Sequence, residues 1–532
     1  MSSSNTNPDP NSNRSNDEDA FIGADEAEEI FTRDEDHPMD SGGEDADGDQ
    51  EMMFEEQEIE LQNDSAAHFD GHTDSIFCIA QHPVHNAIVV TGSGDDSAYL
   101  FDSTPNANRP LLPASYESDP QPRQERESLT PLVKMEGHTD SVNAVAFTEP
   151  RGEYVVTAGL DGRLRAWRDT TGDLNGTAWE FLAEVQEVEE INWVAVCPAR
   201  NGDEEKVNVI ALGGSDGSAW VFRINHKEAS DPVSIVHSFF SHTGPCTAGA
   251  WTPDGNLLAT ASEDGSFYVY DVFGAAAAAG VSYSAGTSAV VGLTAEDQRF
   301  AVEGGLFSVA IAPGGGFAAV GGAEGHIKIV GLPRLASGGA SNPGSGGGAS
   351  SKGRGRPAGG QTSAATAGTL LASLQPQSDS VETLSFSAPP LTLLAAGSVD
   401  GSIALFDTAH RFAVRRFIRE AHEGAVVKVE FLQSRAAAAP AVRPSPLAAA
   451  TTGHRSFLLT SVGIDGIVRR WDARGGTTAA GQGMLNEWKG HLGITENEDG
   501  EQAGGIMGFV QGFDGKRVVT AGDDGISLVF EE

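Results

Sequence analysis

The chain has 532 residues, a formal charge of −42 at neutral pH, 39% hydrophobic residues and three cysteines. Its 76 acidic residues against 34 basic ones would repel a phosphate backbone, which argues against direct binding of nucleic acid. Three cysteines are too few for a disulfide scaffold, and no apolar stretch reaches the length of a membrane span. We expect a monomer without a membrane partner, located in the cytoplasm, with the nucleus as a second compartment.

The first 60 residues contain 21 aspartates or glutamates and two arginines, a formal charge of −19. Subtracting this from −42 leaves −23 for the rest of the chain. A segment so charged and so poor in apolar periodicity buries too little surface to offset the entropy of ordering. The sequence therefore predicts a disordered acidic tail over residues 1–63 and a folded, acidic body over residues 64–532.

An acidic residue, almost always followed by glycine, recurs eight times in the body, each time six places before an aromatic or aliphatic residue. The eight acids are Asp95, Asp161, Asp216, Asp264, Glu324, Asp400, Asp465 and Asp524. Glycine accepts the positive φ of a tight hairpin turn, and the alternating residues that follow are typical of a strand. Each unit is predicted to be a turn that leads into a short strand.

Two further β-rich runs precede most of these turns, as residues 137–147 and 154–159 precede Asp161. Three strands at a spacing of about 40 to 45 residues are typical of one WD repeat. We predict an all-β fold, an eight-bladed WD40-type β-propeller. Its last repeat lacks a fourth strand, and the segment 66–69 is the predicted donor that closes the ring.

Low-complexity insertions between the predicted strands are expected to be surface loops. The long ones lie near residues 103–130, 337–368 and 436–450, and shorter ones lie near Ala275 and at 495–501. Residues 354–357 read Arg-Gly-Arg-Pro, which resembles the hooks that enter the minor groove of DNA. A single copy within a Gly/Ser segment favours a flexible linker.

Several repeats offer a histidine, a strand hydroxyl, the turn acid and a tryptophan, which can form one buried polar chain. The complete sets are His138, Thr157, Asp161 and Trp167 in repeat two, and His422, Ser461, Asp465 and Trp471 in repeat seven. A hydrolase would need a single such constellation, whereas here it recurs, so we interpret these residues as structural. We expect no catalytic residue, no cofactor and no metal ligands.

Additional acids cluster where first strands begin and beside the turns. These are Asp74, Asp140, Glu189, Glu190 and Asp379 before first strands, Glu382 at the start of a strand, and Glu263 and Asp523 just before a turn acid. Carboxylates gathered on one rim create a focused negative potential that attracts a basic partner, although each alone can be a solvated surface charge. Trp193 either adds an aromatic contact to this rim or packs in the core.

Residues 68–80 and 89–101 of the first repeat are similar to the angio-associated migratory cell protein family, as are the second repeat and residues 211–217. The acidic tail, eight repeats and acidic ring agree with this resemblance. It implies the activity of the fungal branch, a dedicated chaperone of the large-subunit ribosomal protein L ten, universal name L sixteen. The implied partner is the basic N-terminal segment of that protein, captured on nascent chains as they leave the ribosome.

Two other functions remain open at this point. A WD-repeat scaffold or adaptor for basic or modified peptides in a larger complex would use the same rim, and would have several stable partners. A hydrolase hidden in the ring would need a unique nucleophile, a metal cluster or a phosphate loop, and the sequence shows none of these.

Overall fold

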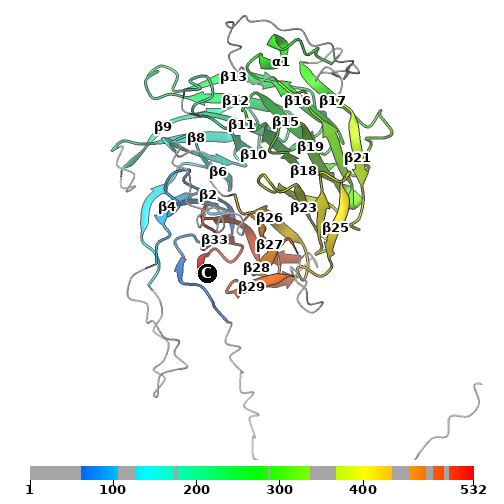
Figure 1. Cartoon of the computed structure of the whole chain (residues 1–532). Coiled ribbons are helices and arrows are strands. Elements are labelled where there is room, and N and C mark those ends of the chain that lie inside the picture. Colours follow the sequence, from blue (N-terminus) through cyan, green and yellow to red (C-terminus); the bar gives the residue numbers. More distant parts are fainter. Residues whose placement is uncertain are drawn as a thin grey trace, which may run out of the picture. The chain divides into compact units, whose positions relative to one another are not determined.

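The computed structural model describes residues 62–105, 127–171, 178–200, 202–284, 288–335, 367–433, 456–474, 483–496 and 502–532. Within these ranges the chain forms eight four-stranded antiparallel sheets and one two-stranded sheet. Figure 1 shows the four-stranded sheets following one another around a ring. The structure thus confirms the eight-bladed propeller. No helix of the described chain is long and apolar enough to cross a membrane.

Each of the first four blades takes its strands in chain order from the channel outward. Blade 1 contains β2 (Ile76–Gln81), β3 (Ile88–Ser93), β4 (Ala98–Asp102) and β5 (Pro131–Met135). Blade 2 contains β6 (Val142–Phe147), β7 (Tyr154–Gly159), β8 (Arg163–Asp169) and β9 (Trp179–Gln186). Blade 3 contains β10 (Ile191–Val196), β11 (Val209–Gly214), β12 (Ala219–Ile224) and β13 (Val233–Phe239). Blade 4 contains β14 (Cys246–Trp251), β15 (Leu257–Ser262), β16 (Phe267–Asp271) and β17 (Ala289–Leu293).

Blades 5 to 7 repeat this order. Blade 5 contains β18 (Leu306–Ile311), β19 (Phe317–Gly322), β20 (Ile327–Gly331) and β21 (Leu370–Leu374). Blade 6 contains β22 (Val381–Phe386), β23 (Leu393–Ser398), β24 (Ile403–Asp407) and β25 (Ala413–Ile418). Blade 7 contains β26 (Val426–Phe431), β27 (Leu458–Gly463), β28 (Ile467–Asp472) and β29 (Met484–Lys489).

Blade 8 is built from both ends of the folded body. It contains β32 (Ile506–Gln511), β33 (Arg517–Gly522) and β34 (Ser527–Glu531), and its outer strand is β1 (Ala67–Phe69). β1 pairs antiparallel with β34, with Ala67 opposite Val529. The Phe69 ring is buried and stacks on Phe101 of blade 1 at 4.5 Å between centroids. The segment expected to close the ring therefore does so, and it also packs against the next blade.

The hairpin turns adopt the conformation that the acid–glycine pairs predict. Gly162 has φ 72° and Gly466 has φ 73°, the left-handed region in which glycine carries no steric penalty. In the first repeat Asp96 takes the glycine position and still has φ 59°. Aspartate is one of the few residues that tolerate this region, so the turn survives without glycine.

The hydrophobic core lies between successive blades. The inner strands pack in the order β2, β6, β10, β14, β18, β22, β26 and β32, and β32 returns to β2. The second strands, such as β3 and β7, are buried over their whole length. Blades therefore share apolar side chains with their neighbours, as Ile210 and Phe222 of blade 3 do with Tyr154 of blade 2.

Some insertions differ from expectation. The alanine run near residue 275 contains the short helix α1 (Ala275–Ala278), and a 3₁₀ turn, η2 (Ala323–Gly325), carries the fifth turn acid. Residues 495 and 496, expected to lie in a loop, belong to β30 (Ile494–Glu496), which pairs with β31 (Gln502–Gly504). The acidic tail up to residue 61, the Arg-Gly-Arg-Pro segment and most of the insertions at 103–130, 337–368 and 436–450 lie outside the described residues.

Candidate functional site

Two kinds of loop lie at one end of the ring, here called the acidic face. One leads into the inner strand of each blade, and the other is the hairpin turn between the second and third strands. They are tied by a backbone hydrogen bond, from Gly94 N to Ser75 O at 3.0 Å in blade 1 and from Leu160 N to Ser141 O at 2.9 Å in blade 2. The corresponding pairs in the other blades are Ser215–Glu190, Glu263–Pro245, Ala323–Gly305, Val399–Ser380, Ile464–Ala425 and Asp523–Gly505.

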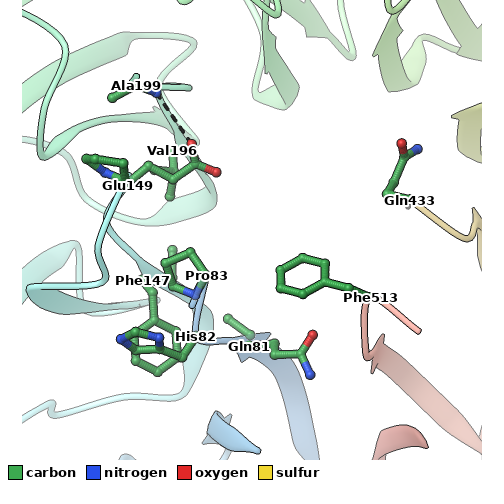
Figure 2. A pocket seen from close by; sticks show the side chains of 12 residues that line it. Gln81, His82, Pro83, Phe147, Glu149, Val196, Ala199, Gln433 and Phe513 are labelled. Atoms are coloured by element: carbon green, nitrogen blue, oxygen red, sulfur yellow. Dashed lines mark hydrogen bonds between the residues drawn. The ribbon is translucent and has the colours of Figure 1, made fainter. Parts of the chain in front are cut away.

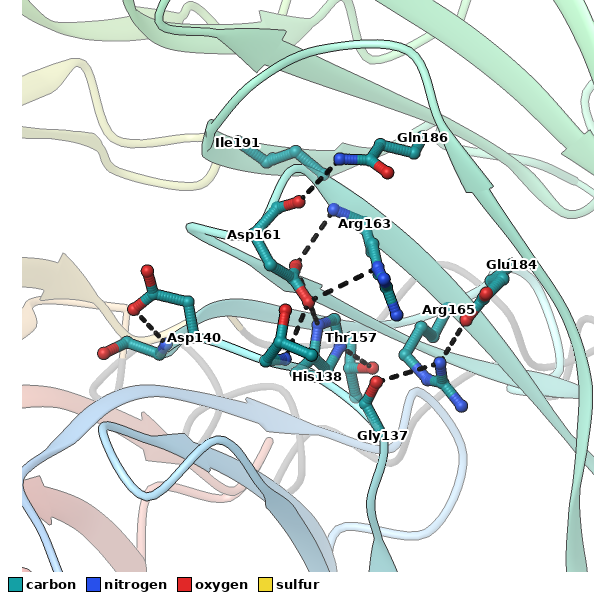
Figure 3. Close-up of polar contacts among 12 residues, drawn as sticks. Gly137, His138, Asp140, Thr157, Asp161, Arg163, Arg165, Glu184, Gln186 and Ile191 are labelled. Carbon is teal, nitrogen blue, oxygen red and sulfur yellow. Dashed lines mark hydrogen bonds and ion pairs between the residues drawn. The ribbon is translucent and has the colours of Figure 1, made fainter.

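In blade 2 a chain of buried polar side chains supports the turn acid (Figure 3). His138 Nδ1 lies 3.1 Å from the Asp161 carboxylate, and His138 Nε2 lies 2.8 Å from Thr157 Oγ1. Trp167 Nε1 donates to the same hydroxyl oxygen at 3.3 Å. Since an ionised carboxylate can only accept, Nδ1 carries the proton and Nε2 accepts from the threonine hydroxyl. The four residues grouped from the sequence are in contact.

Blade 7 contains the second complete chain. Its distances are 2.9 Å from His422 Nδ1 to Asp465 Oδ1, 2.7 Å from His422 Nε2 to Ser461 Oγ, and 2.8 Å from Trp471 Nε1 to Ser461 Oγ. Here Arg469 adds a contact that the sequence pattern does not reveal. Its Nη1 lies 2.8 Å from Asp465 Oδ2, and its Nε lies 2.9 Å from Glu487 of the outer strand.

Within these sets the histidine is held in its neutral form and the aspartate in its ionised form. Burial lowers the pKa of His138 and of His422, which keeps both rings neutral at physiological pH. Burial alone would raise the pKa of Asp161, but hydrogen bonds from the Arg163 and Thr139 amides and from His138 outweigh it, and the pKa lies below its usual value. The carboxylate is thus ionised while its hydrogen-bonding capacity is used within the blade.

The remaining acids of the rim are directed to solvent. Asp74, Asp140, Glu189, Glu190, Glu263, Asp379 and Glu382 are exposed, and Asp523 is half-buried. Asp74 Oδ1 accepts from the Ser75 amide at 2.7 Å, and Asp140 does the same with the Ser141 amide at 2.8 Å (Figure 3). One oxygen of each carboxylate fixes its orientation, and the other remains accessible to a ligand.

These acids are unevenly distributed around the ring. Blades 8, 1, 2, 3 and 4 each carry at least one, and we call this set the acidic arc: Asp523, Asp74, Asp140, Glu189, Glu190 and Glu263. Blade 6 carries Asp379 and Glu382. At the equivalent positions blade 7 has Gly424 and Ile464, and Ile464 lies against Gly424 together with Ile494. A cation therefore meets carboxylates at these positions along five consecutive blades, whereas blade 7 has a glycine and an isoleucine there and carries its exposed acid, Glu423, one residue earlier.

The surroundings of Glu382 disfavour its ionised form, mainly through burial. Burial raises the pKa of Glu382 and the neighbouring Asp379 charge raises it further, while a hydrogen bond from the Ser380 hydroxyl at 2.7 Å acts in the opposite direction. Its side chain keeps exposed surface, as expected at the mouth of a channel where protein surrounds a solvent-filled space. A cation placed beside this pair would relieve the repulsion.

Two aromatic residues of the inner strands have different environments. Trp193 donates from Nε1 to Cys246 O of blade 4 at 3.1 Å, and its ring covers Gly213 and Gly249, so it packs between blades. Phe77 of blade 1 remains 36% exposed beside Asp74, and sequence reasoning missed it. The sequence does contain a signal for Phe77. It is an aromatic residue at the second position of an inner strand, where other repeats have Asn143 or Thr247.

The opposite mouth of the channel contains a cavity of about 530 Å³ (Figure 2). Phe147, Pro83 and Phe513 line it, and Gln433 lies across from Phe147 and Pro83. Its acid, Glu149, accepts from the Ala199 amide at 3.4 Å. A cavity of this composition offers little to a polycation, and the acidic face is the better candidate site.

The described residues contain no group of three or more His, Cys, Asp or Glu side chains that could hold a metal ion. The His–Asp–hydroxyl sets recur in blades 1, 2, 7 and 8, each with the same buried geometry.

The cysteines are shielded from solvent. Cys197 and Cys246 are buried and Cys78 is half-buried. Burial raises the pKa of Cys197 and Cys246 to about 12, so both thiols stay protonated.

Comparison with known proteins adds to this geometry. The family described as WD domain, G-beta repeat matches residues 63–102, 129–168 and 233–271. The ribosome assembly protein SQT1 of Saccharomyces cerevisiae is 26% identical and covers 91% of either chain. The human angio-associated migratory cell protein is 23% identical over 89% of this chain and 81% of its own length.

A solved structure gives a stronger similarity. Sqt1 of Chaetomium thermophilum, bound to the N-terminus of ribosomal protein L10, is 48% identical to this chain, with a TM-score of 0.69. The match covers 88% of this chain and 100% of that one. The same protein without the peptide gives 48% identity and a TM-score of 0.68.

Proposed function

The chain belongs to the Sqt1 family of WD-repeat proteins, and from this premise we propose that it is a ribosome-assembly chaperone for ribosomal protein L10. It binds the basic N-terminal segment of L10 on its acidic face and shields that segment until L10 joins the large subunit. The observation that carries the proposal is the acidic arc, with exposed carboxylates on consecutive blades of a propeller 48% identical to one bound to the L10 N-terminus.

The chemistry of the face suits a binding protein without catalysis. A basic, unfolded segment binds unselectively to RNA and other polyanions, and a rim of carboxylates competes for the same cations. The turn acids, such as Asp161 and Asp465, are engaged in buried hydrogen bonds and hold the loops in place. Release then requires only a polyanion that binds more tightly, such as ribosomal RNA.

The acids of the arc, with Asp379 and Glu382 of blade 6, are the proposed contacts. Exposed acids on the rim act mainly on the rate of association, while those that a bound segment covers act on its dissociation. We further propose that a single copy of this protein captures the segment on nascent chains in the cytoplasm.

A charge-reversal experiment tests the site. The double variant Asp74→Lys/Asp140→Lys should weaken binding of an L10 N-terminal peptide at least roughly tenfold in titration calorimetry, since close charge pairs couple by about 1.5 to 7 kcal/mol. The matched control is Glu228→Lys/Asp231→Lys. This control changes the net charge by the same amount as Asp74→Lys/Asp140→Lys. Its two exposed residues lie between β12 and β13, at the end of blade 3 opposite the acidic face.

Equal affinity of both double variants, each with an unchanged melting temperature, would place the site elsewhere on the propeller. A pull-down of the tagged full chain separates the chaperone from an adaptor. The chaperone should recover L10 as its dominant partner, whereas several stable partners of different kinds would support the adaptor.

A further inference from the structure

Asp74 and Phe77 lie side by side above Gly94 on the acidic face. A β-carbon on Gly94 would lie 3.1 Å from Asp74 Oδ2 and 3.3 Å from the Phe77 ring, so the two side chains border the space that this glycine leaves open. Asp74 Oδ1 is held by the Ser75 amide, and Oδ2 is the oxygen on the side of the ring. An apolar face and an oriented carboxylate oxygen therefore meet at one accessible place.

We propose that Asp74 and Phe77 form a subsite for an arginine side chain, and that this subsite selects arginine over lysine. The proposal rests on the proposed function, since the arginine would belong to the basic segment bound by the acidic face. A guanidinium group is planar, so it can stack on the ring and donate to the carboxylate in the same pose. An ammonium group is more strongly hydrated and has no flat face, so it can use the carboxylate but loses the stacking.

The pair occurs in one blade of the described ring. The residues equivalent to Phe77 are Asn143, Asn192, Thr247, Phe307, Glu382, Val427 and Met507. Asn143, Asn192 and Thr247 donate to backbone carbonyls of the following blade. Phe307 lies on blade 5, where Gly304 takes the position of Asp74.

The subsite is continuous with the rest of the acidic arc. The Ser75 hydroxyl donates to the Asp523 backbone carbonyl at 2.9 Å, which joins the leading loop of blade 1 to the turn of blade 8. A guanidinium beside Asp74 would therefore be close to a second acidic residue. This surrounding charge favours any cation, and the Phe77 ring supplies the preference for arginine.

Two synthetic peptides of equal length and charge test the proposal, one with five Arg-Gly-Ser repeats and one with five Lys-Gly-Ser repeats. At low salt the full-length protein should bind the arginine peptide roughly three- to thirtyfold more tightly in fluorescence anisotropy, the range expected of a cation–π contact. Phe77→Leu should remove this preference and leave the affinity for the lysine peptide unchanged. Phe307→Leu, the same change on a blade without the rim acid, should keep the preference.

Two further variants cover the case in which Phe77→Leu fails to fold. Phe77→Trp keeps an aromatic face and should keep the preference, while Gly94→Val fills the space between the two side chains and should lose it. Equal binding of both peptides by the wild-type protein, or an unchanged preference in folded Phe77→Leu, would overturn the subsite. If the arginine preference holds but an L10 N-terminal peptide does not bind, the proposed function fails and the subsite stands.

Discussion

His242 Nδ1 donates to the hydroxyl oxygen of Ser266 at 2.6 Å, in the position where the corresponding histidines of blades 1, 2, 7 and 8 meet an aspartate directly. The Ser266 hydroxyl in turn donates to Asp264, whose nearest oxygen lies 4.0 Å from the ring. Without an adjacent carboxylate, burial lowers the pKa of His242 to about 4 from an ordinary value of 6.5. The histidine of blade 4 therefore stays neutral until the solution is strongly acidic.

Stability should depend on pH through His242. The unfolded chain takes up this proton near pH 6.5 and the folded chain near pH 4, so the contribution is complete above pH 6.5 and is lost as the pH falls toward 4. At about 1.4 kcal/mol per pH unit, the loss reaches about 3 kcal/mol. The difference in unfolding free energy between the wild type and His242→Gln should shrink from pH 7 to pH 4.5.

Glutamine is a suitable replacement because Gln377 takes the same position in blade 6 and donates to the Ser402 carbonyl at 3.0 Å. The matched control for the loss of an imidazole is His237→Gln, at an exposed histidine of β13. If the difference in unfolding free energy between the wild type and His242→Gln stays constant from pH 7 to pH 4.5, the buried neutral imidazole does not contribute to the pH dependence of stability.

The buried chains of polar side chains predict that removing a turn acid lowers the free energy of unfolding by different amounts in different blades. Asp161→Ala leaves the buried His138 Nδ1 without an acceptor, which typically costs about 1 to 3 kcal/mol. Asp216→Ala is the matched control, because in blade 3 Val188 takes the place of the histidine ring beside Gly214 and the hydrogen bonds of Asp216 to described residues go to Ser218 of its own turn. Chemical denaturation should show the larger loss for Asp161→Ala, and equal losses would contradict the structural role of the chain.

The closing strand gives a test of where the folded body begins. Removing residues 1–61 should leave the melting temperature unchanged, since the described contacts with the ring begin at Asn63, beside Gly490, and at Asp64, whose amide donates to Lys489 O at 2.8 Å. Removing residues 1–69 deletes β1 and should lower it sharply. Phe69→Ala tests the contribution of side-chain packing alone. It should lower the free energy of unfolding by about 3 to 5 kcal/mol, because the ring is fully buried. A truncation at residue 61 that melts early would move the boundary into the tail.

Binding of the L10 peptide should weaken as salt rises, because the acids of the arc act over distances that ions screen. The slope of log Kd against log salt should be shallower for Asp74→Lys/Asp140→Lys than for the wild type. Glu228→Lys/Asp231→Lys should keep the wild-type slope despite an identical change in net charge. Affinity that is independent of salt in the wild type would rule out an electrostatic site.

The architecture was accessible from the sequence because its signals are local. The spacing of each turn acid to its strand, together with the two β-rich runs that precede most turns, defines the blades, and both depend on residues close together in the chain. The donor of the last strand could also be predicted, since a ring with one missing strand has to be completed. The hairpin β30–β31 was missed because its strands are only three residues each and flank an acidic run that reads as a loop.

The details of the site depend on side-chain contacts between strands and on side-chain rotation, which the sequence does not specify. Arg469 reaches Asp465 and Glu487 because the third strand places it between the turn and the outer strand. The contrast between Ser266, which separates His242 from its acid, and Ser97, which leaves His72 in direct contact with Asp95, is a matter of side-chain rotation within the same motif. The lack of a rim acid at Gly304 of blade 5 and at Gly424 of blade 7 likewise depends on the register of the inner strands, which the sequence alone does not show.

The pairing of β1 with β34 has a consequence for the order of events during synthesis. The two strands are separated by more than 450 positions, with Ala67 opposite Val529, so the first strand leaves the ribosome long before its partner exists. Blade 8 cannot form until then, and neither can the contact between Ser75 and Asp523 that joins blade 8 to blade 1. A partly made chain would thus carry the acids of blades 1 to 4 on an open row of blades that lacks its neighbour on the blade 1 side. The complete acidic arc should arise only when translation of the propeller has been completed.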